Sequence, residues 1–186
     1  MRVISGKFKG YKIEFTKNSF TRPLKDSVKE SVFNVLAHSN FFKVRVEKSK
    51  ILDLYSGIGS FGIEALSRGA KKVIFIEQDK FNSKILKNNL VKIAQIDQVK
   101  VINDKIENTL KKKFEDKFDI FFLDPPFSDF NFLENLKTLR DIKIFKKDHI
   151  VIIHREKNVN DNLQNILDIT IIKNYGRSKI IFGKFN

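Results

Sequence analysis

A short acidic and proline-rich turn, Asp124-Pro125-Pro126-Phe127, follows an apolar segment that suits a buried strand. The two prolines fix φ and remove two backbone N–H donors, so the turn is rigid and presents carbonyl acceptors. An exocyclic amine on a nucleobase is a poor nucleophile, because its lone pair is delocalised into the ring. The Asp124 carboxylate and the Pro125 carbonyl could accept both amine hydrogens and orient that lone pair, while Phe127 stacks on the base. We therefore predict that this tetrapeptide is catalytic, the alternative being a Pro-Pro loop capped by a core phenylalanine.

A glycine-rich turn follows an earlier apolar segment, residues 51–54. Gly57, Gly59 and Gly62 have the G-x-G-x-x-G spacing, and a helical pattern comes directly after them. Such a turn lets the backbone bend sharply and approach a ligand closely. Glu77 lies 15 residues after Gly62, where an acidic side chain can accept hydrogen bonds from both hydroxyls of a ribose. These features fit either a nicotinamide dinucleotide or S-adenosylmethionine.

Asp53 favours S-adenosylmethionine over a dinucleotide. A carboxylate just before the glycines would repel a pyrophosphate, but it could hold the ammonium group of the cofactor's methionine end. Asp104, after the third expected strand, is a candidate contact for the adenine amino group, and a helix N-cap is an equally good interpretation. The predicted cofactor-binding residues are Asp53, Tyr55, Gly57, Gly59, Gly62, Glu77 and Asp104.

The elements that must position these residues alternate from residue 51 onward, as expected of an α/β domain around a mainly parallel sheet. Only Gly176 and Arg177 separate the last two expected strands, which favours an antiparallel hairpin at the end of the sheet. The expected strands are 51–54, 73–77, 98–102, 118–123, 150–153, 169–175 and 178–182. The expected helices are 61–67, 80–92, 106–114, 132–140 and 158–166.

The first part of the chain has a different pattern. Residues 2–5 and 11–15 could form a small β-hairpin, followed by a loop through Thr21-Arg22-Pro23. Asp26 or Ser27 could cap a helix that places Val28, Val32, Val35 and Leu36 on one face. We predict an N-terminal basic extension at 1–40, with this hairpin and helix, and a catalytic domain at 41–186.

The chain of 186 residues has a formal net charge of +14, and the excess is concentrated near its start. Residues 1–50 hold 12 Lys and Arg against four Asp and Glu. A localised basic arm predicts a nucleic-acid surface, whereas evenly spread lysines are more typical of a solvated surface. The candidate RNA-binding residues are Arg2, Lys7, Lys9, Lys12 and Arg22.

The absence of cysteine excludes disulfides, thiolate metal sites and a cysteine nucleophile, and we expect no metal. No apolar run approaches the length that crosses a membrane, so we expect a cytoplasmic protein without membrane contact.

Two segments are distinctive: the N-terminal block RVISGKFKG at 2–10 and the run EALSRGA at 64–70. With VKESVFNVL at 28–36 and the longer glycine motif at 52–70, they make nearly the full length of the chain resemble the bacterial RsmD-type 16S ribosomal RNA guanine-N2 methyltransferases. TRP at 21–23, FFLDPPF at 121–127 and YG at 175–176 also match. Two positions depart from the family pattern: His154 stands where an acidic residue is usual, and Asn103-Asp104 replaces a Gly-Asp pair.

The resemblance implies a class I, Rossmann-like methyltransferase fold with S-adenosyl-L-methionine as cofactor. It further implies methyl transfer to the N2 of one guanine, with 16S rRNA or the assembling small ribosomal subunit as partner, and we expect a monomer. The nearest alternative is a DNA or RNA adenine-N6 or cytosine-N4 amino methyltransferase. Two more distant candidates are a nicotinamide-dependent oxidoreductase and a catalytically silent RNA-binding module.

Overall fold

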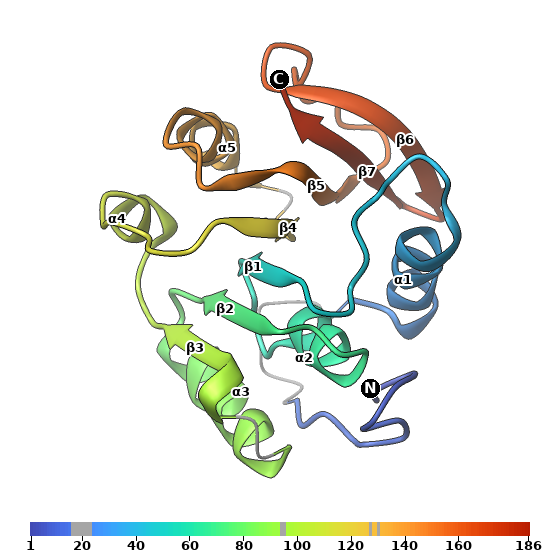
Figure 1. Ribbon diagram of the computed structural model, residues 1–186, viewed down its shortest axis with the longest axis vertical. Helices are drawn as coiled ribbons and strands as arrows, with labels where there is room; N and C mark the ends of the chain where they lie inside the picture. The colour runs from blue at the N-terminus through green and yellow to red at the C-terminus, as the bar shows by residue number, and fades with distance from the viewer. Residues whose placement is uncertain (16–23, 94–95, 127, 130) are drawn as a thin grey trace.

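The centre of the molecule is one seven-stranded sheet, seen in the computed structural model, which describes residues 1–15, 24–93, 96–126, 128–129 and 131–186 (Figure 1). The strands are β1 Lys50–Leu54, β2 Lys72–Ile76, β3 Val99–Ile102, β4 Phe118–Leu123, β5 Phe145–Glu156, β6 Leu167–Tyr175 and β7 Ser178–Phe185. The helices are α1 Asp26–His38, α2 Ser60–Ser67, α3 Lys80–Lys92, α4 Ile106–Leu110 and α5 Phe132–Asp141, with a short 3₁₀ helix at Ile96–Gln98.

The strand order is β3-β2-β1-β4-β5-β7-β6. The first five strands run parallel, whereas β7 is antiparallel to both β5 and β6. Gly176 and Arg177 alone join β6 to β7, and Tyr175 pairs with Ser178 across this turn. The predicted parallel sheet with an antiparallel C-terminal hairpin is therefore confirmed.

The order of the strands reverses at β1, since β2 lies on one side of it and β4 on the other. Ligands of open α/β sheets bind at such a switch point, beyond the carboxyl ends of the strands. β1 and β4 end side by side, because Leu54 pairs with Leu123. The glycine turn and the Asp124 turn therefore start from the same edge of the sheet.

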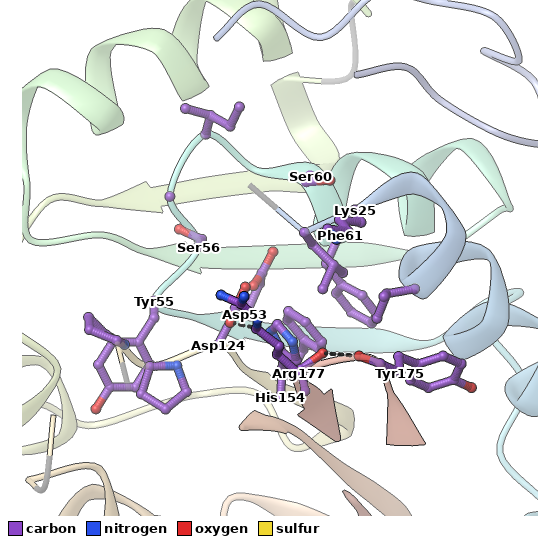
Figure 2. Close-up of a pocket in the computed structure, with 18 of the residues that line it drawn as sticks. Lys25, Asp53, Tyr55, Ser56, Ser60, Phe61, Asp124, His154, Tyr175 and Arg177 are labelled. Atoms are coloured by element: carbon purple, nitrogen blue, oxygen red, sulfur yellow. Dashed lines mark hydrogen bonds and ion pairs between the residues drawn. The ribbon is translucent and has the colours of Figure 1, made fainter. Parts of the chain in front are cut away.

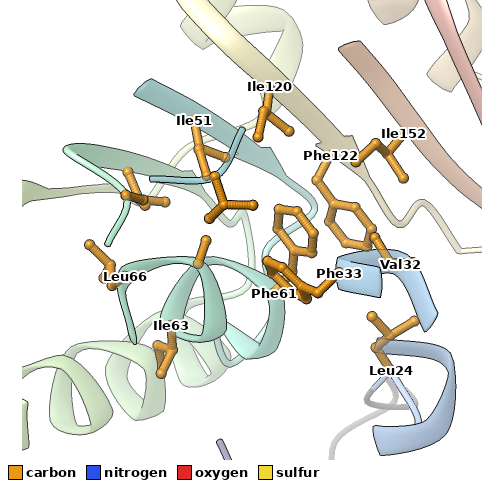
Figure 3. Close-up of a cluster of buried hydrophobic side chains, with 14 of the residues drawn as sticks. Leu24, Val32, Phe33, Ile51, Phe61, Ile63, Leu66, Ile120, Phe122 and Ile152 are labelled. Carbon is orange, nitrogen blue, oxygen red and sulfur yellow. The ribbon is translucent and has the colours of Figure 1, made fainter. Parts of the chain in front are cut away.

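Two buried clusters cover the two faces of the sheet. Side chains along a strand alternate between faces, so Ile51 belongs to the cluster under α1, α2 and α3, and Leu52 to the cluster under α4 and α5 (Figure 1). In the first cluster the Phe61 ring stacks on Phe122 at 4.0 Å between centroids and on Phe33 at 5.0 Å (Figure 3). This stack packs α1 and α2 against β4 directly behind the Asp124 turn.

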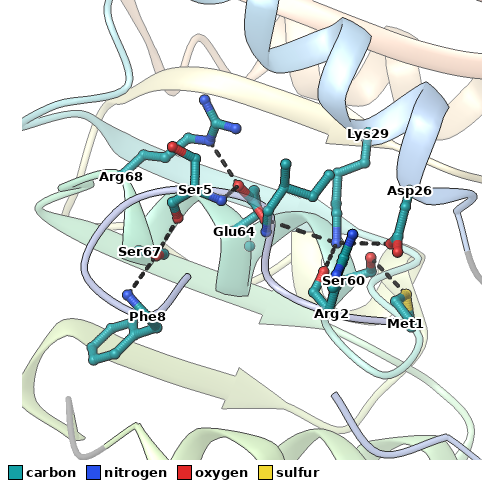
Figure 4. Close-up of polar contacts among 12 residues, drawn as sticks. Met1, Arg2, Ser5, Phe8, Asp26, Lys29, Ser60, Glu64, Ser67 and Arg68 are labelled. Carbon is teal, nitrogen blue, oxygen red and sulfur yellow. Dashed lines mark hydrogen bonds and ion pairs between the residues drawn. The ribbon is translucent and has the colours of Figure 1, made fainter. Parts of the chain in front are cut away.

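The N-terminal arm, residues 1–15, lies against α2 as irregular chain. The predicted hairpin of 2–5 and 11–15 is present only as a short antiparallel pairing. An isolated bridge joins Arg2 and Lys12, and backbone hydrogen bonds join Val3 to Gly10 and Tyr11 and Met1 to Ile13. The backbone N–H groups of Ile4 and Ser5 instead donate to the two carboxylate oxygens of Glu64, at 2.7 and 3.0 Å (Figure 4). These donors are satisfied by a helix side chain, so they need no partner strand.

Glu64 is the centre of a buried ionic cluster that fixes this arm. Its carboxylate accepts from Arg68 Nε at 2.8 Å and lies 3.8 Å from Lys29 Nζ, and Lys29 donates to the Arg2 carbonyl (Figure 4). Burial lowers the pKa of Lys29, and the charge of Glu64 opposes that fall. The N-terminal arm, α1 and α2 contribute to one hydrophobic cluster. The predicted boundary between an N-terminal extension and a catalytic domain at residue 40 stays a prediction.

The start of α1 differs from the sequence prediction. Lys25 occupies the N-cap position and no side chain caps the helix, so the predicted cap by Asp26 or Ser27 is wrong. Asp26 is the first helical residue, where its negative charge interacts favourably with the positive end of the helix dipole. Its Oδ1 lies 3.5 Å from Lys29 Nζ.

Residues 158–166 form an irregular segment, so the predicted helix there is wrong. Leu163 and Ile166 are buried, which explains their helix-like spacing, but Asp161 is drawn to Arg155 at the end of β5. α4 also ends at Leu110, four residues earlier than predicted, and β5 begins five residues earlier.

Candidate active site

One cavity of about 850 Å³ lies at the carboxyl ends of β1, β4 and β5, as ligand pockets of α/β sheets do (Figure 2). It brings together the glycine turn, the Asp124 turn, the start of α1 and the β6–β7 turn. Its lining residues are Leu24, Lys25, Val28, Asp53, Tyr55, Ser56, Gly57, Ile58, Ser60, Phe61, Phe122, Asp124, Pro125, Pro126, Ser128, His154, Tyr175, Gly176, Arg177 and Ser178.

The glycine turn requires glycine at two positions for reasons of space. A Cβ on Gly59, whose φ is +88°, would lie 2.3 Å from Leu86 Cδ1. A Cβ on Gly62 would lie 2.2 Å from the Phe75 ring and 2.9 Å from the Asp53 carboxylate. Both separations are shorter than real Cβ contacts, so in each variant the turn or the contacted side chain would have to shift.

Asp53 is a buried carboxylate with one oxygen engaged. Its Oδ2 accepts from the Gly62 N–H at 3.0 Å, and its Oδ1 accepts no hydrogen bond within the described part of the chain. Burial raises the pKa of the Asp53 carboxyl well above its usual range, and the Gly62 hydrogen bond offsets part of that rise. A buried acceptor that lines a cavity fits a cationic ligand group, such as the ammonium predicted from the sequence.

The Glu77 carboxylate binds the backbone of the glycine turn. Its Oε2 accepts from the Gly57 N–H at 2.6 Å and its Oε1 from the Asp79 N–H at 2.8 Å. Burial raises the pKa of Glu77, and these two hydrogen bonds oppose the rise. Glu77 is not among the cavity-lining residues, so its contact with a ribose stays a prediction.

Tyr55 and Asp104 have different surroundings. Tyr55 lines the cavity with a φ of +58°, and its hydroxyl accepts from Asn135 Nδ2 at 3.0 Å. Burial raises the pKa of Tyr55.

Asp104 lies outside the cavity lining and bonds Asn108 and Lys112, and these two partners lower the pKa of Asp104. Its contact with adenine stays a prediction, and the cap position of α4 belongs to Lys105.

Asp124 pairs with His154 of β5, a residue that the sequence analysis noted only as a departure from the family pattern. Asp124 Oδ1 lies 2.8 Å from His154 Nδ1, because β4 and β5 are parallel neighbours. Pro125 is buried and Pro126 exposed, and both line the cavity. Phe127, the fourth predicted catalytic residue, lies outside the described residues. The structure thus brings Asp53, Tyr55, Gly57, Asp124, Pro125 and Pro126 to one cavity.

Arg155 supports this turn and was missed by sequence reasoning. Its guanidinium is fully buried, donates to the Pro126 carbonyl at 3.2 Å and binds both carboxylate oxygens of Asp161. The same group lies over the Phe132 ring at 4.3 Å. The available signal was an arginine two residues after the apolar run 150–153, with Asp161 six residues later, but nothing in the sequence linked it to Pro126.

The predicted RNA-binding residues lie apart from the cavity. Arg2, Lys7, Lys9 and Lys12 are exposed on the N-terminal arm, and none of them lines the cavity. Arg22 lies outside the described residues. RNA binding by this arm stays a prediction.

The described helices include no candidate membrane span. Among the described residues, no group of three or more His, Asp or Glu side chains is arranged to hold a metal ion.

Comparisons with known proteins agree with this arrangement. The family model "Conserved hypothetical protein 95" matches residues 1–184. The chain is 37% identical over 160 residues to "Ribosomal RNA small subunit methyltransferase D" of Haemophilus influenzae, covering 84% of this chain and 79% of the relative. "Putative methyltransferase yhhF" from Escherichia coli has a TM-score of 0.85 at 26% identity, covering 100% of this chain and 98% of the other.

A more distant structure, "A putative sam-dependent methyltransferase" from Streptococcus mutans, has a TM-score of 0.65 at 12% identity, covering 85% of this chain and 48% of the other. The sheet topology and these neighbours confirm the predicted class I methyltransferase fold. Because the family model covers almost the whole chain, the protein belongs to the conserved hypothetical protein 95 family, the RsmD family that its sequence resembles.

Proposed function

We propose that the chain transfers a methyl group from S-adenosylmethionine to the exocyclic N2 amine of one guanine in 16S ribosomal RNA. Methyl transfer in the small ribosomal subunit is the activity in the name of the Haemophilus influenzae relative. The cavity supports this function with a carboxylate for a cationic cofactor and a carboxylate for an amine.

The observation that carries the proposal is the entry of Asp53 and Asp124 into one cavity from neighbouring parallel strands. The glycine turn begins just beyond β1, beside Asp53. A methyl donor held at this turn and a base held at Asp124 would share the cavity. Holding two reactants in one orientation removes much of the entropic barrier to a bimolecular transfer.

The cofactor site would be built from the glycine turn, Tyr55 and Asp53. Asp53 Oδ1 would accept from the ammonium group, since it is buried and accepts no hydrogen bond from the described residues. S-Adenosylmethionine supplies a methyl group on a positively charged sulfur, so the site needs no acid for the leaving group. Glu77 toward the ribose and Asp104 toward the adenine complete the proposed set.

Asp124 would orient the target amine. His154 already engages Oδ1, which leaves Oδ2 and the Pro125 carbonyl to accept the two amine hydrogens. The nitrogen lone pair would then point away from both acceptors, and the Asp124 charge would compensate the positive charge that develops on nitrogen. In this role Asp124 positions the amine and need not remove its proton before the bond forms.

The choice of guanine N2 and of 16S rRNA rests on the family resemblance, because adenine-N6 and cytosine-N4 amines would need the same acceptors. The proposed partner is the rRNA itself or the assembling small subunit, which places the protein in the cytoplasm. We also propose that the protein acts as a monomer.

The test is incubation of the protein with labelled S-adenosylmethionine and small ribosomal subunits, or their RNA, from a strain that lacks the gene. We expect label in N2-methylguanosine after nucleoside digestion, and none with Asp124→Ala. Label in N6-methyladenine or N4-methylcytosine would support the alternative function. Cofactor binding with no label in any nucleic acid would contradict the proposal and favour a catalytically silent binding module.

A further inference from the structure

The cavity lining includes residues beyond the cofactor site just described, and the lining carries both negative and positive side chains. Asp53 and Asp124 lie at the strand ends beside the glycine turn, whereas the two cationic side chains of the lining, Lys25 and Arg177, come from the start of α1 and from the β6–β7 turn. Figure 2 shows Tyr55 and Ser56 on one side and Lys25 and Tyr175 on the other, with Asp124 and, nearer to Tyr175, Arg177 between them. We call the part of the cavity that is lined by Leu24, Lys25, Val28, Tyr175 and Arg177 the hairpin end.

The hairpin end is a fixed structure. Gly176 has a φ of +56°, which allows the two-residue turn, and the Arg177 carbonyl accepts from the Lys157 N–H at 2.9 Å. The Tyr175 hydroxyl forms a hydrogen bond with Ser31 Oγ of α1. These contacts join β6, α1 and the segment after β5, so the position of Arg177 over the cavity is set by three parts of the fold.

One wall of the cavity at the hairpin end is apolar. Leu24 and Val28 are buried at the start of α1, and Phe61 and Phe122 form a stacked pair behind them. Lys25 and Arg177 are exposed at the rim, and Tyr175 is half-buried. An apolar wall with cations at its rim fits a flat base whose attached phosphate remains at the surface.

On the basis of the proposed function, we propose that the hairpin end is the subsite for the extruded target nucleotide. Leu24, Val28 and Tyr175 contact the base, and Arg177 with Lys25 binds the phosphate next to it. Asp124 lies between this subsite and the glycine turn, so a base held there presents its amine at the Asp124 carboxylate.

Charge complementarity indicates which ligand binds at which part of the cavity. The cofactor's methionine end carries an ammonium, a sulfonium and one carboxylate, so its net charge is positive, and the acidic part of the cavity attracts it more than the cationic part does. The RNA backbone carries one negative charge per nucleotide and has the opposite preference. A single cavity therefore sorts its two ligands without a dividing wall.

The test compares Arg177→Ala with Lys173→Ala. Both changes remove one exposed cation from the same hairpin, but Lys173 is not a lining residue of the cavity. RNA affinity is measured across a salt series without turnover, and methylation is measured with labelled cofactor. For Arg177→Ala we expect roughly tenfold weaker RNA binding and a salt slope smaller by about 0.7–0.9, the change for one lost phosphate contact.

The other expected results separate the subsite from a general charge effect. Lys173→Ala should bind RNA within about twofold of wild type, and Arg177→Lys should recover part of the affinity because it restores a point charge. Affinity for the cofactor should be unchanged in all three variants. Tyr175→Ala should raise the KM for RNA, whereas Ser31→Ala, which keeps the tyrosine ring, should raise it less.

Two failures can be told apart. If wild-type protein methylates the RNA but Arg177→Ala and Lys173→Ala have the same RNA affinity and salt slope, the subsite is wrong and the proposed function stands. If wild-type protein transfers no methyl group to any RNA, the proposed function fails. In that case equal salt slopes would overturn the subsite too, since they are measured without catalysis.

Discussion

His154 Nδ1 lies 2.8 Å from Asp124 Oδ1, so a histidine at the end of β5 orients the carboxylate at the end of β4. A carboxylate acceptor requires a proton on Nδ1, which neutral imidazole can carry and imidazolium always carries. The contact therefore fixes the Asp124 rotamer and directs Oδ2 away from His154.

This contact predicts how His154 variants behave. Asn places an amide nitrogen close to the position of His Nδ1, so His154→Asn should keep most of the activity. His154→Ala should lower kcat roughly tenfold, with the KM for the cofactor unchanged, because Asp124 loses its orienting donor. Single-turnover methylation measures both variants. Equal rates for the two would mean that His154 only fills space.

Asp124 itself should be more sensitive. Asp124→Ala removes both acceptor oxygens, and we expect a loss of at least about a hundredfold, the scale for removal of a positioned electrostatic group. Asp124→Asn keeps one acceptor oxygen, for which His154 and the target amine compete, so partial activity should remain. Cofactor affinity, measured by calorimetry, should change little in either variant. An Asp124→Ala protein with near-wild-type rates would place the catalytic site elsewhere.

Asp53 should reduce the stability of the ligand-free protein at neutral pH. Its folded-state pKa is raised by burial, so the folded protein binds that proton more tightly than the unfolded chain. The Asp53 contribution to stability therefore falls as pH rises from the ordinary Asp range, about pH 4, through the raised value. Asp53→Asn keeps an acceptor for Gly62 and removes the charge.

We therefore expect Asp53→Asn to raise the neutral-pH Tm by about 2–4 °C, the shift for roughly 1 kcal/mol in a chain of this size. The gain should shrink below about pH 4, where Asp53 is protonated in the folded and unfolded states alike. The same variant should bind S-adenosylmethionine about tenfold or more weakly, since a charge-assisted hydrogen bond is lost. Thermal unfolding across a pH series, with and without cofactor, tests both effects. A Tm gain that is the same at every pH would contradict the assignment.

Arg155 should be needed for both stability and catalysis. Arg155→Met leaves the buried Asp161 carboxylate without its bidentate partner, which should cost about 3–5 kcal/mol in urea unfolding. The double variant Arg155→Met/Asp161→Leu should recover most of that stability, because no buried charge remains. Its kcat should stay low, since nothing replaces the donor to the Pro126 carbonyl. Full kcat in the double variant would show that the guanidinium only supports folding.

The N-terminal arm offers a test of the remaining basic residues. Reversing the charges of Arg2, Lys7 and Lys9 should weaken RNA binding and reduce its salt slope by about one unit per lost phosphate contact. The control reverses Lys111, Lys113 and Lys117, which are exposed before β4, at the end opposite to the cavity. If the two triple variants have the same slope, the arm is only a solvated surface.

The fold followed from the sequence wherever one strong local pattern decided the structure. The strands around Ile51 and Ile120 and the two-residue turn at Gly176 belong to this class, and the glycine spacing located the cavity. The apolar spacing at 158–166 wrongly predicted a helix. Leu163 and Ile166 are buried in the core, but they lie on an irregular segment that the Arg155–Asp161 ion pair fixes.

The contacts that complete the site join residues far apart in sequence, and no local pattern encodes them. His154 is 30 residues from Asp124, and Arg155 is 29 from Pro126. Only the neighbouring positions of β4 and β5 bring each pair together. The predicted hairpin near Arg2 is shortened for a similar reason, since Glu64, which accepts from the Ile4 N–H, is 60 residues away.

Helix α2 links the two surfaces that the protein would use. Gly62 donates its N–H to Asp53 at the cavity, and Glu64, two residues later, holds the backbone of Ile4 and Ser5 in the arm. A displacement of the arm by a bound polyanion would act on the same helical turn that supports the glycine loop. Occupancy of the two surfaces would then be thermodynamically coupled, and the coupling would be reciprocal: the factor by which RNA changes the affinity for cofactor would equal the factor by which cofactor changes the affinity for RNA.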